Sequence, residues 1–153
     1  DDAEADRARA CMAYGSLLSG ITLAQVGLGS VHGLASPLGA YFPIAHGVVC
    51  GTLVATATQV NVRALTERAS HSPALDKYTQ VAALLSEESP PSKPLWEILQ
   101  TWTDRLGIVR LGAYGVRETD IGKIVANARG GSMQTNPIVL TDEEIGAIVR
   151  ARL

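Results

Sequence analysis

One uncharged stretch, residues 27–47, constrains the fold of this 153-residue chain more than any other part of it. It reads GLGSVHGLASPLGAYFPIAHG and lies between two long apolar segments that are typical of helices. It carries His32 and His46, separated by a segment with glycine and proline. An imidazole among apolar groups needs a polar partner, and two imidazoles placed in this way could share one. A metal ion is one candidate for the shared partner.

Composition predicts one domain, 1–153, with a sizeable core. Hydrophobic residues make up 46% of the chain, and its length suits a single domain. Only 18% of the residues are charged, which is low for a chain that must cover its own surface. This favours contact of part of the surface with another domain or subunit, as in a homo-oligomer, over a fully covered helical bundle.

The net charge and the cysteine content limit which binding partners and which cellular compartment we expect. The net charge is −2 and no basic run occurs, so we expect no nucleic acid partner. Cys11 and Cys50 form no CxxC pair, and their apolar surroundings predict buried free thiols, as in the reducing cytoplasm. The acidic first residues do not resemble a signal peptide. The most apolar segment, 17–28, predicts a buried helix and no membrane span.

The segment before the central stretch, residues 3–26, predicts one helix. Its first turn is acidic, which suits the positive end of a helix dipole. From Cys11 onward the segment is apolar almost all round, which predicts a central, buried position. Gly15 and Gly20 each cost about 1 kcal/mol of helix stability relative to alanine, which a helix crossing closely there would explain. The abrupt helical start indicates a piece of a longer chain.

The central stretch and the segment after it predict two further helices. Ser30 is expected to cap a short helix that carries His32, and Pro37 and Gly39 are expected to disturb that helix. Residues 45–60 are rich in β-branched side chains and would suit a strand by composition alone. Their length and their place among helices favour a helix. Residues 61–69 predict a short helix or its continuation.

The rest of the chain predicts helices separated by clear breakers. Pro90, Pro91 and Pro94 mark a loop over 89–94. The expected helices cover residues 73–86 after a Ser72 cap, 95–106, 119–129, and 141–153 after a capping box from Thr141 to Glu144. No repeat and no strand-rich section occurs. The fold class predicted is all-α, with about seven helices.

From the residues alone, His32 and His46 have two readings. Their spacing is not that of a zinc finger, and paired core histidines with hydrogen-bonded rings are the more common case. Cys50 follows His46 by one helical turn, so a Cys–His pair is conceivable, although an inert buried thiol is favoured. His71, between two serines, is expected to be exposed and without a role. No dinucleotide fingerprint, P-loop or GxSxG motif is present.

The central stretch resembles the signature of the iron-containing (metal-dependent, group III) alcohol dehydrogenase family. In that family a pattern of the form GLGxVHxLAHPLGAxFxxPHG carries two histidine ligands at this separation. The later part of the chain also follows the family's closing pattern, in Gly115-Val116 with Asp120-Ile121, in Asn136-Pro137, and in the helix that opens at Thr141.

This resemblance implies an all-helical C-terminal domain next to an N-terminal Rossmann-like domain that binds NAD or NADP. The metal, Fe²⁺ most often and Zn²⁺ sometimes, lies between the two domains and is held by an aspartate and three histidines. His32 and His46 match the last two histidines. The other ligand pair lies some tens of residues upstream in the family, and the residues before His32 contain no histidine. We therefore expect domain 1–153 to be incomplete, without the nucleotide-binding domain and the first metal ligands.

Two positions depart from the family pattern. Ser36 stands where the family often has a histidine that is thought to help proton transfer, one turn after the first ligand. The resemblance thus makes Ser36 the candidate catalytic residue in the vicinity of the substrate oxygen. Ala45 replaces the usual proline before the second ligand, which reduces loop rigidity and removes no ligand.

The resemblance implies a full-length enzyme that oxidises an alcohol or reduces an aldehyde or ketone. The metal would polarise the substrate oxygen while hydride passes to or from the nicotinamide. The chain alone is expected to be inactive, because it has no nicotinamide site. The alternative is a metal-free helical interaction module in which His32 and His46 are merely packed. Metal storage or sensing is a weaker third option, since two histidines are few ligands.

Overall fold

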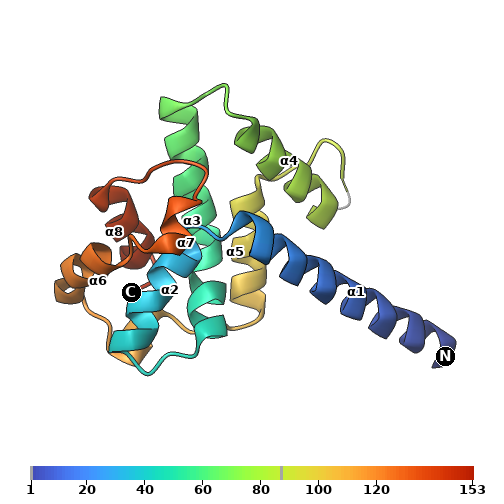
Figure 1. The fold of residues 1–153 in the computed structure, drawn as a ribbon, viewed down its shortest axis with the longest axis horizontal. Coiled ribbons are helices and arrows are strands. Elements are labelled where there is room, and N and C mark those ends of the chain that lie inside the picture. Colours follow the sequence, from blue (N-terminus) through green and yellow to red (C-terminus); the bar gives the residue numbers. More distant parts are fainter. Residues whose placement is uncertain (1, 87) are drawn as a thin grey trace.

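The computed structural model describes residues 2–86 and 88–153, and this part of the chain folds into helices and loops without a strand (Figure 1). The all-α prediction is therefore confirmed. The α-helices are α1 (Asp2–Val26), α2 (Ser30–Tyr41), α3 (His46–Arg68), α4 (Pro73–Ser86), α5 (Leu95–Arg105), α6 (Ile121–Asn127), α7 (Gly131–Gln134) and α8 (Asp142–Arg150). Two short 3₁₀ helices, η1 (Leu111–Tyr114) and η2 (Glu118–Asp120), lie between α5 and α6.

Helix α3 lies at the centre of the bundle and packs against α2, α4, α5 and α8. It is one continuous helix, so residues 61–69 continue it and the strand alternative is wrong. Its length and hydropathy would also suit a membrane span, but 56% of its most apolar window is buried inside the bundle. Burial of this kind is common in the core helix of a globular domain, and it explains the small and β-branched side chains of α3.

The main core joins α2, α3, α6 and α8. Fully buried leucine, isoleucine and valine side chains meet there, including Leu34, Leu53, Ile124, Ile145 and Ile148. A smaller cluster between α4 and α5 contains Ala82, Leu95 and Ile98. Helix α5 covers another side of α3, so both clusters are attached to the same central helix. The positions of α2 and α3, which carry the candidate site, are therefore set by the main core.

Helix α2 runs through Pro37 to Tyr41, so the expected disturbance at Pro37 and Gly39 is wrong. A proline inside a helix removes one backbone hydrogen bond and costs about 3 kcal/mol in an exposed helix. Here Leu34, Pro37 and Leu38 are all buried in the core, and this packing offsets the cost. Ser30 is also not a cap. It is the first residue of the helix, and Gly29 occupies the cap position.

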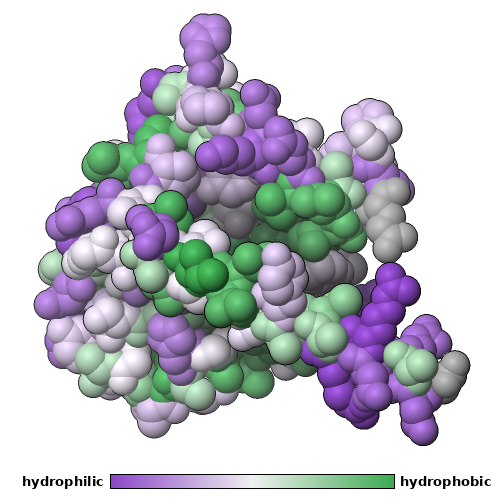
Figure 2. Space-filling view, turned by 45° about the vertical axis from the view of Figure 1, so that its right-hand side comes forward, coloured by the Kyte–Doolittle hydropathy of each residue, from purple (hydrophilic) through white to green (hydrophobic). Residues whose placement is uncertain are grey.

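Helix α1 contradicts the sequence prediction of a central helix. It projects from the bundle and none of its residues is buried (Figure 1). Residues 17–28 and Cys11, which were expected to be buried, are consequently exposed or half-buried. In Figure 2 the far end of α1 is mainly hydrophilic, and hydrophobic side chains gather nearer the bundle. The prediction failed because apolar composition shows only that a helix needs a partner surface. The described residues leave α1 uncovered.

The ends of the later helices agree closely with the predicted breakers. Helix α8 opens with the expected capping box, in which Thr141 Oγ1 accepts from the Glu144 backbone N–H and the Glu144 carboxylate accepts from the Thr141 N–H. Glu144 also accepts hydrogen bonds from Arg68 at 2.6 and 3.1 Å, which ties α8 to the end of α3. The Arg68 guanidinium holds the pKa of Glu144 below its ordinary value, and backbone hydrogen bonding adds to this effect.

We predict that Glu144→Gln destabilises the fold at neutral pH and ceases to do so in acid. A lowered pKa in the folded state means that the carboxylate adds stability above its unfolded pKa of about 4.3. That contribution disappears as the pH falls through the lowered pKa. Chemical denaturation across this pH range measures the difference between the two proteins. Glu143→Gln, an exposed neighbour in the same helical turn, is the control, and a pH-independent gap for Glu144→Gln would contradict the assignment.

Candidate metal centre

The structure brings His32 and His46 together, as the sequence predicted. His32 lies in the first turn of α2, and His46 is the first residue of α3. The extended residues Phe42 and Ala45 flank the link between the helices, and α2 packs against α3. The two ring centroids are 5.2 Å apart, with the rings tilted by 51°. Two imidazoles so close, one exposed and one half-buried, can present nitrogen atoms to one common partner.

Cys50 is the third member of this cluster. Its Sγ lies 3.5 Å from Nε2 of His46 and 3.8 Å from Nε2 of His32. One potential ligand atom from each of the three side chains lies within 4.8 Å of the other two. Cys50 is half-buried, so the prediction that this thiol is buried is wrong, whereas the conceivable Cys–His contact is present in the structure. The i, i+4 spacing from His46, which places both on one helix face, was the sequence signal for this contact.

Burial shifts the pKa values of two members of this cluster toward their uncharged forms. Burial, and then the charge of His46, lower the pKa of His32, so its neutral ring is favoured. Burial raises the pKa of the Cys50 thiol. Neutral imidazole is the form that binds a metal ion. The His32 ring is thus held in its ligating form over a wider pH range than an ordinary histidine.

A hydrogen-bonded network fixes the start of α2, two residues before His32. The Ser30 backbone N–H donates to Oδ1 of Asn136 at 3.0 Å, which replaces the missing side-chain cap. Nδ2 of Asn61, on α3, donates to Ser30 Oγ and to Asn136 Oδ1. Asn136 Nδ2 donates back to Asn61 Oδ1 at 2.8 Å and to the Ile138 carbonyl. Sequence reasoning assigned Asn136 to a loop, and nothing local in the sequence shows that it reaches α2 and α3.

A surface cavity of about 430 Å³ adjoins the cluster. His32 and Cys50 lie in its wall, together with apolar side chains of α3, among them Val54 and Ala57. Ser36 lies one turn after His32 on α2 and is exposed, outside the wall of this cavity. The cavity can therefore admit a small molecule to the cluster from the side of α3.

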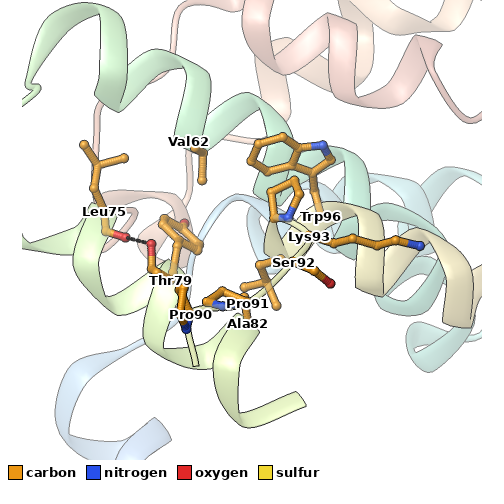
Figure 3. Close-up of a pocket in the computed structure, with 12 residues that line it drawn as sticks. Val62, Leu75, Thr79, Ala82, Pro90, Pro91, Ser92, Lys93 and Trp96 are labelled. Atoms are coloured by element: carbon orange, nitrogen blue, oxygen red, sulfur yellow. Dashed lines mark hydrogen bonds between the residues drawn. The ribbon is translucent and has the colours of Figure 1, made fainter. Parts of the chain in front are cut away.

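A second pocket lies between α3, α4 and the 89–94 loop, as shown in Figure 3. Its volume is about 360 Å³, and Val62, Pro91 and Trp96 are among its walls. Among the described residues, its lining contains no histidine, cysteine or carboxylate. The described lining thus offers none of the usual metal ligands, so the candidate metal centre is the His32–His46–Cys50 cluster.

The donor set of the cluster fits a divalent metal ion. Imidazole nitrogen suits Fe²⁺ and Zn²⁺, and sulfur adds a softer donor that suits Zn²⁺. The two Nε2 atoms approach the same sulfur atom, and the lowered pKa of His32 favours its neutral ring. His46 is exposed, which leaves an entry path for the ion. His71, the other histidine, is exposed in the turn between α3 and α4, as predicted.

Comparison with known proteins assigns the chain to a family. A sequence model described as the C-terminal part of the Fe-containing alcohol dehydrogenase family matches residues 1–153. The chain belongs to this family. Its resemblance to iron-containing alcohol dehydrogenases, inferred from the central stretch, is thus confirmed.

Individual members of the iron-containing alcohol dehydrogenase family match nearly the whole chain. The 1,3-propanediol dehydrogenase of Klebsiella pneumoniae is 30% identical over an alignment of 153 positions that covers 94% of this chain and 37% of that protein. The NAD-dependent methanol dehydrogenase of Bacillus methanolicus is 27% identical over an alignment of 154 positions that covers 95% of this chain and 38% of that protein. The chain therefore spans a little over a third of the length of these relatives.

A solved structure agrees with the fold. The crystal structure of a 1,3-propanediol oxidoreductase superposes with a TM-score of 0.75 at 31% identity, over 93% of this chain and 37% of that one. The all-α bundle thus has the fold of the C-terminal part of the iron-containing alcohol dehydrogenase family. The ligand roles of His32 and His46 and the role of Ser36 stay predictions at this point.

We predict that Asn136→Ala destabilises the domain by about 2 kcal/mol. It removes the partner of the Asn61 side-chain oxygen and of the first N–H of α2, and unpaired buried polar groups cost about 1–3 kcal/mol. Urea denaturation measures the loss. Asn127→Ala, which removes an exposed amide on α6, should change stability by less than about 0.5 kcal/mol. Equal stability of the two variants would show that the network does not hold α2.

Proposed function

We propose that this domain forms the metal-binding side of the active site of an NAD(P)-dependent alcohol dehydrogenase. The observation that supports it best is the convergence of His32 and His46 Nε2 on one point, in a chain of the iron-containing alcohol dehydrogenase family. The reaction is oxidation of a small alcohol or reduction of an aldehyde or ketone. The relatives are named for such reactions on methanol and 1,3-propanediol.

In this proposal the chain's own residues hold and shape the reaction site. His32 and His46 donate neutral imidazole lone pairs to a divalent metal, Fe²⁺ in the first place and Zn²⁺ in the second. The metal, when bound, supplies Lewis-acid polarisation of the substrate oxygen. Asn61 and Asn136 hold the start of α2, and through it His32, in place. Preorganisation of this kind removes the need to reorient ligands during the reaction.

The substrate approaches through the cavity beside His32 and Cys50. Its apolar wall at Val54 and Ala57 suits the carbon chain of a small alcohol. Ser36, exposed one turn after His32, is proposed to lie on the solvent side of the reacting oxygen, where a hydroxyl and water can pass a proton to bulk water. The nicotinamide is bound by another domain of Rossmann type, and a cytoplasmic homo-oligomer is the proposed assembly.

The alternative proposal is a metal-free helical interaction module. The exposed apolar side chains of α1, among them Met12, Leu17 and Ile21, favour it, because a surface of this kind is usually covered by a partner. It does not account for the approach of two imidazoles and a thiol at the mouth of a cavity. The dehydrogenase proposal explains both the cluster and the family membership.

Metal titration tests the ligand roles. We predict that the chain binds Fe²⁺ or Zn²⁺ and that the His32→Ala, His46→Ala double variant loses this binding, because two of its nitrogen donors are gone. Isothermal titration calorimetry under anaerobic conditions measures the affinity. His71→Ala removes an exposed histidine outside the cluster and should bind as the parent does. Equal binding by all three proteins would rule out a site at His32 and His46.

An activity assay tests the need for another domain. We predict that the 153-residue chain, loaded with Zn²⁺ or Fe²⁺, produces no NADH or NADPH from methanol or 1,3-propanediol. The sequence has no dinucleotide fingerprint with which to place the nicotinamide near the cavity. Nicotinamide absorbance measures turnover. Reduction of either nucleotide above the protein-free rate would contradict the division of roles between two domains.

A further inference from the structure

We propose that Cys50 is a metal ligand, so that His32, His46 and Cys50 together present two nitrogen donors and one sulfur donor to the metal. This inference rests on the metal site of the proposed function and adds a donor that the family pattern does not contain. The two histidines come from the starts of α2 and α3, and Cys50 comes from the second turn of α3. No aspartate or glutamate belongs to this cluster in the described part of the chain.

The distances suit coordination of one ion by these donors. Metal–sulfur bonds of about 2.3 Å and metal–nitrogen bonds of about 2.0–2.1 Å place two donors of a tetrahedral site about 3.6 Å apart. The Cys50 Sγ to Nε2 distances are 3.5 Å for His46 and 3.8 Å for His32, on either side of that value. A tetrahedral ion bound to these three donors would have a fourth coordination position open for another ligand, as catalytic zinc sites do.

Hydrogen bonding alone explains the cluster less well. A thiol has one proton and can donate to only one of the two Nε2 atoms. The other contact then needs an imidazole N–H that donates to sulfur, which is a weak acceptor. The 3.8 Å contact to His32 is longer than the 3.5 Å contact to His46. A cation between the three atoms would be a partner for all of them at once, and both sulfur–nitrogen distances are already within a few tenths of an ångström of the tetrahedral value.

Metal binding at Cys50 requires the loss of one proton. The S–H bond breaks as the metal–sulfur bond forms, and the proton passes to solvent. The bound thiolate carries one negative charge and faces a divalent cation. Because sulfur is a soft donor, the site should prefer Zn²⁺ and Co²⁺ to hard cations such as Mg²⁺. The half-buried position of Cys50 protects the thiolate from solvent without closing the path to it.

Cobalt titration of the 153-residue chain tests the proposal, because Co²⁺ reports its own ligands. Sulfur bound to Co²⁺ gives a charge-transfer absorption in the near ultraviolet, whereas nitrogen ligands give only the visible ligand-field bands. The chain has two cysteines, and Cys11 is exposed on α1. In Cys11→Ser, therefore, any cobalt–thiolate band must come from Cys50. Cys50→Ser and the His32→Ala, His46→Ala variant complete the set, with circular dichroism as the check on folding.

The expected result is a charge-transfer band in the parent and in Cys11→Ser and none in Cys50→Ser. Cys50→Ser should also bind Co²⁺ more weakly by at least the roughly 10–100-fold that loss of an outer-shell partner costs. It should release one proton fewer per ion in a weakly buffered indicator assay. Visible bands without a charge-transfer band in Cys11→Ser would overturn the role of Cys50 and leave the histidine site standing. No cobalt binding by the parent would overturn both.

Discussion

The candidate site depends on the packing of α2 against residues 128–136. A Cβ atom added at Gly33 would lie 2.8 Å from the Ala128 carbonyl oxygen and 2.9 Å from Cε of Met133, so only glycine permits this approach. Asn136 holds the same end of the helix through the Ser30 N–H. His32 lies between these two anchors. Its direction is therefore set by a close backbone contact and a hydrogen bond, both from a segment about a hundred residues later.

Helix α1 is exposed, and the rest of the described chain does not stabilise it. A helix of 25 residues with no buried side chain receives no support from the core. The Gly27 backbone adopts a left-handed conformation with φ of 71°, and α1 and α2 meet there at a bend of 92°. The bend directs α1 away from the bundle, so the main core and the metal cluster form without it. The candidate site can therefore form in this fold whether or not a partner surface covers α1.

Sequence patterns predicted the helices better than their surroundings. Breakers and caps such as Ser72, Pro73 and the Thr141 capping box act locally, and the helix ends near them were predicted within a few residues. The passage of α2 through Pro37 and the exposure of α1 depend on which surfaces meet, which no local pattern contains. The positions of His32 and His46 in the sequence left their approach as one of two alternatives, and the family resemblance favoured it. The contact between Cys50 and His46 could be predicted from the sequence, because their spacing places both side chains on one face of a helix.

A sulfur donor at Cys50 would also contribute to the net charge around the metal. In the ligand set that the resemblance implies, an aspartate supplies the single negative charge and three neutral imidazoles supply none. A Cys50 thiolate beside His32 and His46 supplies that same single charge from within this domain. If the thiolate took the place of that aspartate, the net charge around a divalent ion would be unchanged, and so would its capacity to act as a Lewis acid. What changes is the softness of the donor, which shifts the preference from Fe²⁺ toward Zn²⁺. In the proposed site, the side chain at position 50 of α3 would thus decide the preference between the two metals, while His32 and His46 would hold either ion.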